Sequence, residues 1–188
     1  MSSELPSYRR EKGLPLSLPW VAFKMSLSKE VKTMISGVHH FSFSVSNLDR
    51  TIEFYTKTLG VTLQSRGRNK YDTLGGALFG TKWGVNQAQA DLELAVVNIG
   101  GTRVEFIEYK DPAARAYHKN PSIAGSAHIA FKVEDIEGTR KKLESAGVEF
   151  HSVINSYLEA GKNEWKWCYF RDPDGIVLEL VQQSEERE

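Results

Sequence analysis

The chain has 188 residues, of which 40% are hydrophobic and 26% are charged, and its 24 basic and 24 acidic side chains leave no net charge. This length suits one domain or two small modules with a shared core, and the balanced charge argues against nucleic acid or an anionic membrane as partner. The single cysteine, Cys168, excludes an internal disulfide, and no apolar run approaches the roughly 18 residues of a membrane-spanning helix. These features predict a cytoplasmic protein.

In chain order, the first segment is an N-terminal extension, residues 1–34, whose stretch LPLSLPWVAF is too short and too rich in proline for a secretory signal. We expect one domain over residues 35–183, followed by a tail at residues 184–188. Within the domain we expect two modules, at about residues 35–109 and 126–183, joined by a linker at residues 110–125.

The modules are predicted from an internal repeat. The segment HHFSFSVSNLDRTIEFYTKTLGV returns as AHIAFKVEDIEGTRKKLESAGV, and His40 corresponds to His128 at an offset of 88 residues. Each copy has the pattern of a strand, a turn, a helix and a glycine. In the first copy a helix is predicted from Leu48 to Leu59, because its apolar residues share one face, and Gly60 ends it.

A second similarity joins the segments near the ends of the two modules. The segment GTRVEFIE, residues 101–108, is similar to GIVLELVQ, residues 175–182, so that Glu105 matches Glu179 at an offset of 74. The surplus of the first copy lies in a predicted loop at Arg66–Ala90, and further strands are predicted at Asp91–Asn98 and Trp165–Arg171. The sequence therefore predicts an α+β fold of two βαβββ modules with mixed sheets and pseudo-twofold symmetry.

The repeated histidines and glutamates have the character of metal ligands. Strand alternation places His40 on a face with small polar residues, and it predicts that His39 is turned away from that face. Glu179 lies in the apolar run IVLELV, where an unpaired carboxylate costs several kcal/mol. If the modules pack about a twofold axis, His40, Glu105, His128 and Glu179 supply two nitrogen and two oxygen ligands for one divalent cation in a cup.

Four segments carry a family resemblance: HHFSFSVSNLDRTIEFYTKTLGV, VEFIEY, AHIAFKVEDI and YFRDPDGIVLELVQ. They resemble the signature segments of the vicinal oxygen chelate superfamily, which includes glyoxalase I, methylmalonyl-CoA epimerase, extradiol dioxygenases and bleomycin-binding proteins. The resemblance covers about residues 36–183 and implies that His40, Glu105, His128 and Glu179 are the metal ligands. It also implies a homodimer and a small-molecule substrate, with one divalent ion (Ni, Co, Zn or Mn) at each site, or Fe in a dioxygenase.

Four ligands of this kind resemble those of bacterial glyoxalase I. The resemblance implies a lyase or isomerase that moves a proton α to a carbonyl through a metal-stabilised enediolate, with Glu179 as the base and Glu105 able to return the proton. An acyl-CoA epimerase, a single-domain extradiol dioxygenase and a small-molecule binding or resistance protein are the alternatives.

Further side chains are candidates for contact with the substrate. Glu93, in the predicted strand DLELAVV, is a candidate for an extra base. Arg66, Arg68 and Lys70 are a candidate basic cluster for glutathione, although a solvated charge run explains these three residues better. The candidates for the substrate mouth are Tyr71, Trp83, Asn86, Tyr157, Lys162, Trp165 and Trp167.

Overall fold

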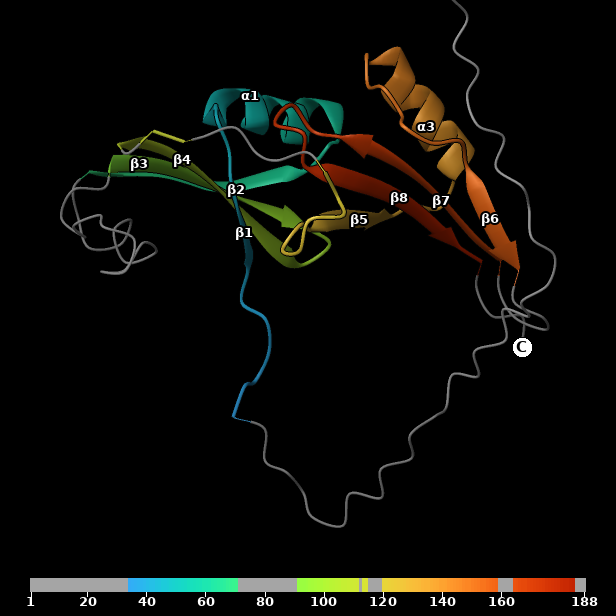
Figure 1. Ribbon diagram of the computed structural model, residues 1–188, viewed down its shortest axis with the longest axis horizontal. Coiled ribbons are helices and arrows are strands. Elements are labelled where there is room, and N and C mark those ends of the chain that lie inside the picture. The colour runs from blue at the N-terminus through green and yellow to red at the C-terminus, as the bar shows by residue number, and fades with distance from the viewer. Residues whose placement is uncertain (1–33, 71–90, 112, 115–119, 159–163, 185–188) are drawn as a thin grey trace, which may run out of the picture. The chain divides into compact units, whose positions relative to one another are not determined.

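The computed structural model describes residues 34–70, 91–111, 113–114, 120–158 and 164–184 (Figure 1). The elements below belong to one compact unit, Val38–Glu188. The first half contains β1 (Phe41–Ser44), α1 (Leu48–Glu53), a π-helical segment (Phe54–Thr58), β2 (Thr62–Lys70), β3 (Asp91–Ile99) and β4 (Thr102–Asp111). The second half contains β5 (His128–Lys132), α3 (Ile136–Ser145), β6 (Asn155–Leu158), β7 (Glu164–Arg171) and β8 (Val177–Gln183). Among the described residues, no helix is long and apolar enough to cross a membrane.

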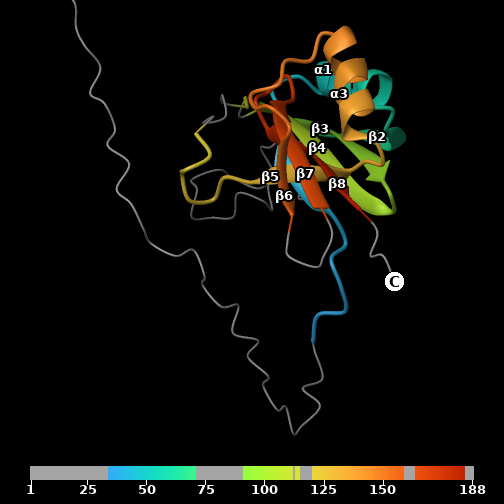
Figure 2. The same ribbon diagram turned by 90° about the vertical axis from the view of Figure 1, so that its right-hand side faces the viewer.

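Each half forms one four-stranded mixed sheet with the same topology. The strand orders are β1-β4-β3-β2 and β5-β8-β7-β6. In both sheets the first strand of the half runs parallel to the last, and the remaining pairs are antiparallel. In Figure 2 the strands β3 and β4 of the first sheet are green, and the strands of the second sheet are orange to red. The predicted α+β fold of two βαβββ modules is confirmed.

The two helices start in the same way, which shows that the sequence repeat is also a repeat of local chemistry. The side chain of Asn47 accepts a hydrogen bond from the backbone N–H of Arg50, and Asp135 caps α3 by accepting one from Gly138, both at 2.9 Å. The side chain of Glu108 accepts a hydrogen bond from the backbone N–H of Leu48, the first residue of α1. In the same way the side chain of Gln182 accepts one from Ile136, the first residue of α3, and both bonds measure 2.8 Å. Matching side chains thus satisfy the backbone donors that the start of a helix leaves free.

Two predicted boundaries differ from the structure. The α-helix predicted to run to Leu59 ends at Glu53 and continues as the π-helical segment, in which the N–H of Leu59 bonds to the carbonyl of Phe54, five residues back, at 3.1 Å. Gly60 follows with a φ of 71°, as a helix end of this kind requires. The strand β2 extends to Lys70, so the loop predicted at Arg66–Ala90 is wrong for residues 66–70.

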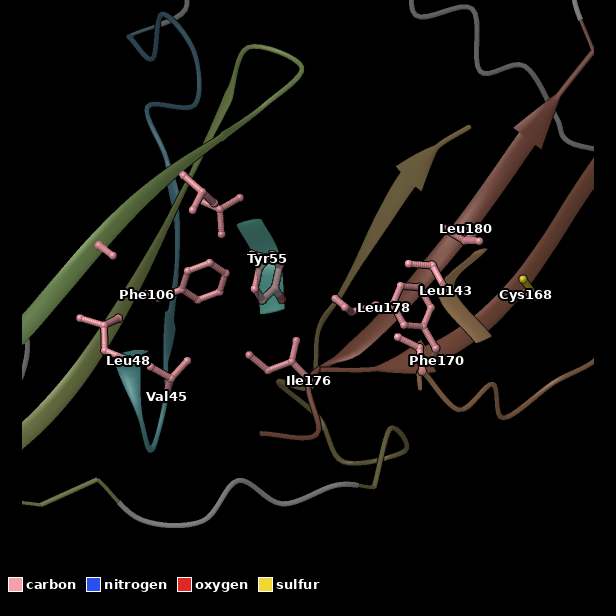
Figure 3. Close-up of a cluster of buried hydrophobic side chains, with 14 of the residues drawn as sticks. Val45, Leu48, Tyr55, Phe106, Leu143, Cys168, Phe170, Ile176, Leu178 and Leu180 are labelled. Atoms are coloured by element: carbon pink, nitrogen blue, oxygen red, sulfur yellow. The ribbon is translucent and has the colours of Figure 1, made fainter. Parts of the chain in front are cut away.

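The hydrophobic core joins both halves (Figure 3). In the first half Tyr55 and Phe106 are fully buried, with ring centroids 4.4 Å apart. In the second half Phe170 is fully buried and its ring centroid lies 5.0 Å from that of Phe150. The core therefore occupies one face of each sheet and leaves the other face for a site.

Polar contacts also connect the halves. Arg50 donates to the carboxylate of Asp174 at 2.9 Å, and Ser46 donates to the same oxygen. The hydroxyl of buried Tyr55 lies 3.5 Å from the carboxylate of Asp172, in the turn between β7 and β8. These contacts place charged groups of the Asp172–Asp174 turn at the junction of the two halves.

Candidate metal centre

The predicted ligands form two His/Glu pairs. In the N-terminal pair, Nε2 of His40 lies 3.8 Å from Oε2 of Glu105, and in the C-terminal pair the same atoms of His128 and Glu179 lie 3.2 Å apart. Both histidines are about half exposed, whereas the side chains of Glu105 and Glu179 are only 21% and 11% exposed. Each pair thus combines a carboxylate held in the sheet with an imidazole at the surface.

The strand register explains why both pairs have the same geometry. Ser42 of β1 pairs with Glu105 of β4, and Ala130 of β5 pairs with Glu179 of β8. His128 is the first residue of β5 and precedes Ala130 by two positions, so it shares the face of Glu179. His40 stands one residue before β1, and its imidazole approaches Glu105 from the start of that strand. The small side chain between them leaves room for the imidazole to approach the carboxylate.

The two pairs remain separate. Among the described residues, no cluster of three or more His, Cys, Asp or Glu side chains suited to a metal ion is present. The structure therefore brings the four predicted ligands together only two by two, as two pairs of one His and one Glu each.

His39 does not turn away from the N-terminal pair, contrary to the expectation from strand alternation. Its Nδ1 lies 2.8 Å from Nδ1 of His40, its Nε2 lies 3.2 Å from a guanidinium nitrogen of Arg103, and it lines the same recess of about 210 Å³ as His40 and Glu105. The expectation failed because β1 begins at Phe41, so both histidines precede the strand and alternation does not apply to them.

The aromatic side chain of Tyr169 lies beside the C-terminal pair. Tyr169 pairs with Glu179 across β7 and β8, and its ring centroid lies 6.3 Å from that of His128. Burial raises the pKa of Tyr169, and the charge of Glu179 and a hydrogen bond to it add to this effect. Sequence reasoning missed Tyr169, although it follows the candidates Trp165 and Trp167 at the same two-residue spacing.

Three of the substrate candidates lie on this same face. Trp167 pairs with Val181 and Trp165 with Gln183, both in the alternate positions of β8 that include Glu179. Tyr157 of β6 pairs with Trp165. The opposite face of β7 carries Cys168 and Phe170, which are buried in the core. Tyr71, Trp83, Asn86 and Lys162 lie outside the described residues.

Glu93 is on the wrong face to act as the extra base. It pairs with Glu108, and it alternates with the buried core residues Ala95 and Val97 rather than with Glu105. Its carboxylate accepts a hydrogen bond from Arg66 at 2.9 Å. Glu93 therefore has a local partner on the core face of the sheet.

The two arginines of the candidate basic cluster form ion pairs, and the side chain of its third member, Lys70, lies outside the described part of the chain. The pKa of Arg66 is raised, mainly by the hydrogen bond from its guanidinium to Glu93 and next by the one to Asp49. Arg68 forms ion pairs with Asp91 at 2.9 Å and with Glu93 at 3.8 Å. The two arginines thus pair with carboxylates of the chain itself.

Comparison with known proteins identifies the family. The model of the glyoxalase/bleomycin resistance protein/dioxygenase superfamily matches residues 37–180, a range that contains both His/Glu pairs. The chain belongs to this superfamily.

Relatives of the superfamily have several activities. A 2-epi-5-epi-valiolone epimerase of an Actinomyces species is 28% identical over 147 residues, which are 77% of this chain and 78% of the relative. A probable lactoylglutathione lyase of Vibrio parahaemolyticus is 28% identical over 151 residues, 78% of this chain and 90% of the relative. The crystal structure of a glyoxalase family protein from Bacillus cereus matches this chain with a TM-score of 0.67 at 23% identity. The match covers 82% of this chain and 99% of the Bacillus cereus chain. The superfamily fold is thus shared, while the named activities differ.

Proposed function

We propose that this chain is a metal-dependent lyase or isomerase that moves a proton from the carbon next to a carbonyl group. The observation that carries the proposal is the repeated His/Glu pair: the same two residue types occur at the same register, on the same face of the sheet, in both halves. A structural role for one such pair would not require its exact repetition in the other half. The relatives named as lyase and epimerase support the same class of reaction.

The residues fit a divalent cation. Imidazole nitrogen and carboxylate oxygen suit borderline cations such as nickel, cobalt, zinc or manganese. The 3.2 Å and 3.8 Å separations within the pairs bring nitrogen and oxygen donors close together in both halves. A bound cation supplies positive charge, which stabilises the negative charge that develops on a carbonyl oxygen when the neighbouring proton leaves.

Glu179 is the proposed base. Its low exposure favours proton transfer over solvation of the carboxylate, and the neighbouring Tyr169 holds its position through a hydrogen bond. Glu105, from the N-terminal pair, is the proposed group that returns the proton. Two carboxylates from opposite halves allow the proton to leave and return on different atoms of the substrate.

The test is metal analysis together with proton exchange. We expect about one divalent ion per chain after reloading, lost in His128→Ala, and exchange of the substrate C–H in deuterated water measured by NMR with the hemithioacetal of methylglyoxal and glutathione and with hydroxyacetone. Glu179→Gln abolishes the exchange, and Glu149→Gln, a change at an exposed glutamate, is the matched control. Exchange that survives in a metal-loaded Glu179→Gln protein refutes the assignment of the base. Iron together with oxygen-dependent ring cleavage of catechol indicates the dioxygenase, and failure to bind any metal leaves a binding protein as the better account.

The complete site is proposed to form between two chains. Each half-site offers one His and one Glu, and the described residues do not gather the four within one chain. In a twofold dimer, the N-terminal pair of one chain can face the C-terminal pair of its partner, and symmetry then produces two complete sites.

A hollow between the two halves supports the same dimer. It has a volume of about 850 Å³ and is lined mainly by apolar side chains, including Phe41, Phe43, Ile129 and Phe131. Phe41 is 52% exposed. A second copy that covers this hollow would remove apolar surface from water, at about 25 cal/mol for each Å² buried.

Complementation tests the shared site. In a mixture of His40→Ala and His128→Ala chains, a shared site regains all four ligands at one of the two sites of each heterodimer. Free exchange of subunits then restores about a quarter of the wild-type metal content and activity. A site within one chain gives no restoration at all, because every chain lacks one ligand.

An epimerase acting on an acyl-CoA or a sugar-derived ketone is the second candidate. It is favoured by the two carboxylates, since inversion at carbon requires removal and return of the proton on opposite sides, and by the epimerase relative. The two candidates differ in their product: an epimerase retains the substrate constitution and changes only the configuration at the exchanging carbon.

A further inference from the structure

The open face of the second half has an aromatic character that its fold does not require. Trp165, Trp167 and Tyr169 alternate along β7 on the face of Glu179, and Tyr157 adds a fourth ring from β6. Trp165 is 43% and Tyr157 is 59% exposed. Side chains of this size gain stability from burial, so their exposure together on one face marks a surface that a ligand can cover.

The first half provides an internal control. Val96 pairs with Glu105 as Tyr169 pairs with Glu179, and Leu94 occupies the position that corresponds to Trp167. The next strand outward carries Gly67 opposite Leu94. At these matched positions of the third strand the first half has aliphatic side chains where the second half has aromatic ones, so the rings of β7 are not needed to build the sheet; the aromatic residue Tyr109 of the first half lies on β4 instead.

The spacing relates the rings to the metal pair. Residues two positions apart in a strand are separated by about 7 Å, so Trp167 lies about 7 Å and Trp165 about 13 Å along β7 from Tyr169. Tyr169 itself contacts the C-terminal pair. A ligand whose oxygens are held near Glu179 and His128 therefore has the ring of Tyr169 beside it, and Trp167 follows at the next position on the same face of β7.

We infer that the substrate is an α-oxygenated carbonyl compound that carries an aromatic ring, and that this ring lies against Trp167 and Trp165. The inference rests on the proposed function, because it takes the C-terminal pair as the place where the oxygens bind. It narrows that function, since an aliphatic substrate of the same reaction leaves the aromatic surface exposed to water.

The test compares two probes that differ in the ring alone. Mandelate and lactate both present a hydroxyl next to a carboxylate, and mandelate adds a phenyl group. We expect the metal-loaded protein to bind mandelate at least about fivefold more tightly than lactate in calorimetric titrations, because stacking of aromatic rings adds to the burial of their area. Trp167→Ala removes this preference by weakening mandelate alone, whereas Trp167→Phe retains a flat ring and most of the preference.

The outcomes separate the inference from the proposed function. Equal affinities for the two probes, or a preference that Trp167→Ala leaves intact, overturn the aromatic substrate and leave the metal site standing. Binding of neither probe overturns it as well. If the protein binds no metal, the proposed function fails, and the same pair of titrations on the metal-free protein still decides the aromatic surface. Circular dichroism of both variants establishes that they are folded.

Discussion

The carboxyl of Asp172 makes the stability of the protein depend on pH. Asp172 is 5% exposed in the turn that joins β7 to β8. Burial raises its pKa from the ordinary 3.8 to about 6, with a contribution from the charge of Asp174, against hydrogen bonds from the backbone N–H groups of Ile176 and Asp174 that favour the charged form. Tyr55 and Arg50 face the same turn from the first half.

The change in pKa sets the size and the sign of the effect. The pKa of Asp172 rises from 3.8 to about 6, and each pKa unit corresponds to about 1.4 kcal/mol. The ionisation of Asp172 therefore changes the free energy of unfolding by about 3 kcal/mol. Below pH 3.8 the carboxyl is protonated in the folded and the unfolded chain, and it costs nothing. As pH rises toward 6 the unfolded chain loses the proton first, so the folded state loses stability, and above about pH 6 the full amount is lost.

Asp172→Asn removes this dependence. The asparagine oxygen can still accept the hydrogen bonds from Asp174 and Ile176 that the aspartate accepts at 2.9 and 2.8 Å, and the side chain no longer ionises. We expect the free energy of unfolding of the variant, relative to wild type, to increase by about 3 kcal/mol between pH 3.5 and pH 8.

Urea denaturation of the chelated proteins at several pH values measures this difference. Glu149→Gln, which neutralises an exposed carboxylate, is the control and leaves the pH profile close to that of wild type. A difference between Asp172→Asn and wild type that stays constant from pH 3.5 to pH 8 refutes the reasoning, because it shows that the carboxyl titrates alike in both states.

Three further changes have expected outcomes. Phe170→Ala leaves a cavity beside Phe150, and we expect a loss of about 3 to 5 kcal/mol in unfolding free energy, read from chemical denaturation. Gly60→Ala places a Cβ at a φ of 71° where no heavy atom lies within 4 Å, so the cost is that of the backbone alone, about 1 to 2 kcal/mol, and Gly60→Asn costs less. Metal at a hundredfold excess over its Kd stabilises the folded state by about 3 kcal/mol. We therefore expect chelation to lower the melting temperature of the wild type and to leave that of His128→Ala unchanged. An equal decrease in both proteins contradicts the assignment of His128 as a ligand.

The sequence by itself determined the modules, because their signals are local and occur twice. The glycines Gly60 and Gly147 mark the helix ends in both copies, and strand alternation separates the core face from the face of the glutamates. The correspondence of His40 with His128 and of Glu105 with Glu179 also follows from this repeat. A period of two along a strand needs no knowledge of the rest of the fold.

Other features depended on contacts between segments that are distant in the chain. The facing of His39 was decided by where β1 begins, and the facing of Glu93 by its pairing with β4, neither of which the local pattern specifies. The raised pKa of Asp172 arises from burial in a turn at the junction of the halves, where Tyr55 approaches it from the other half. The separation of the four predicted ligands into two His/Glu pairs likewise depends on how the halves pack. Local propensity determines each half, whereas only long-range packing decides which surfaces the two halves bring together.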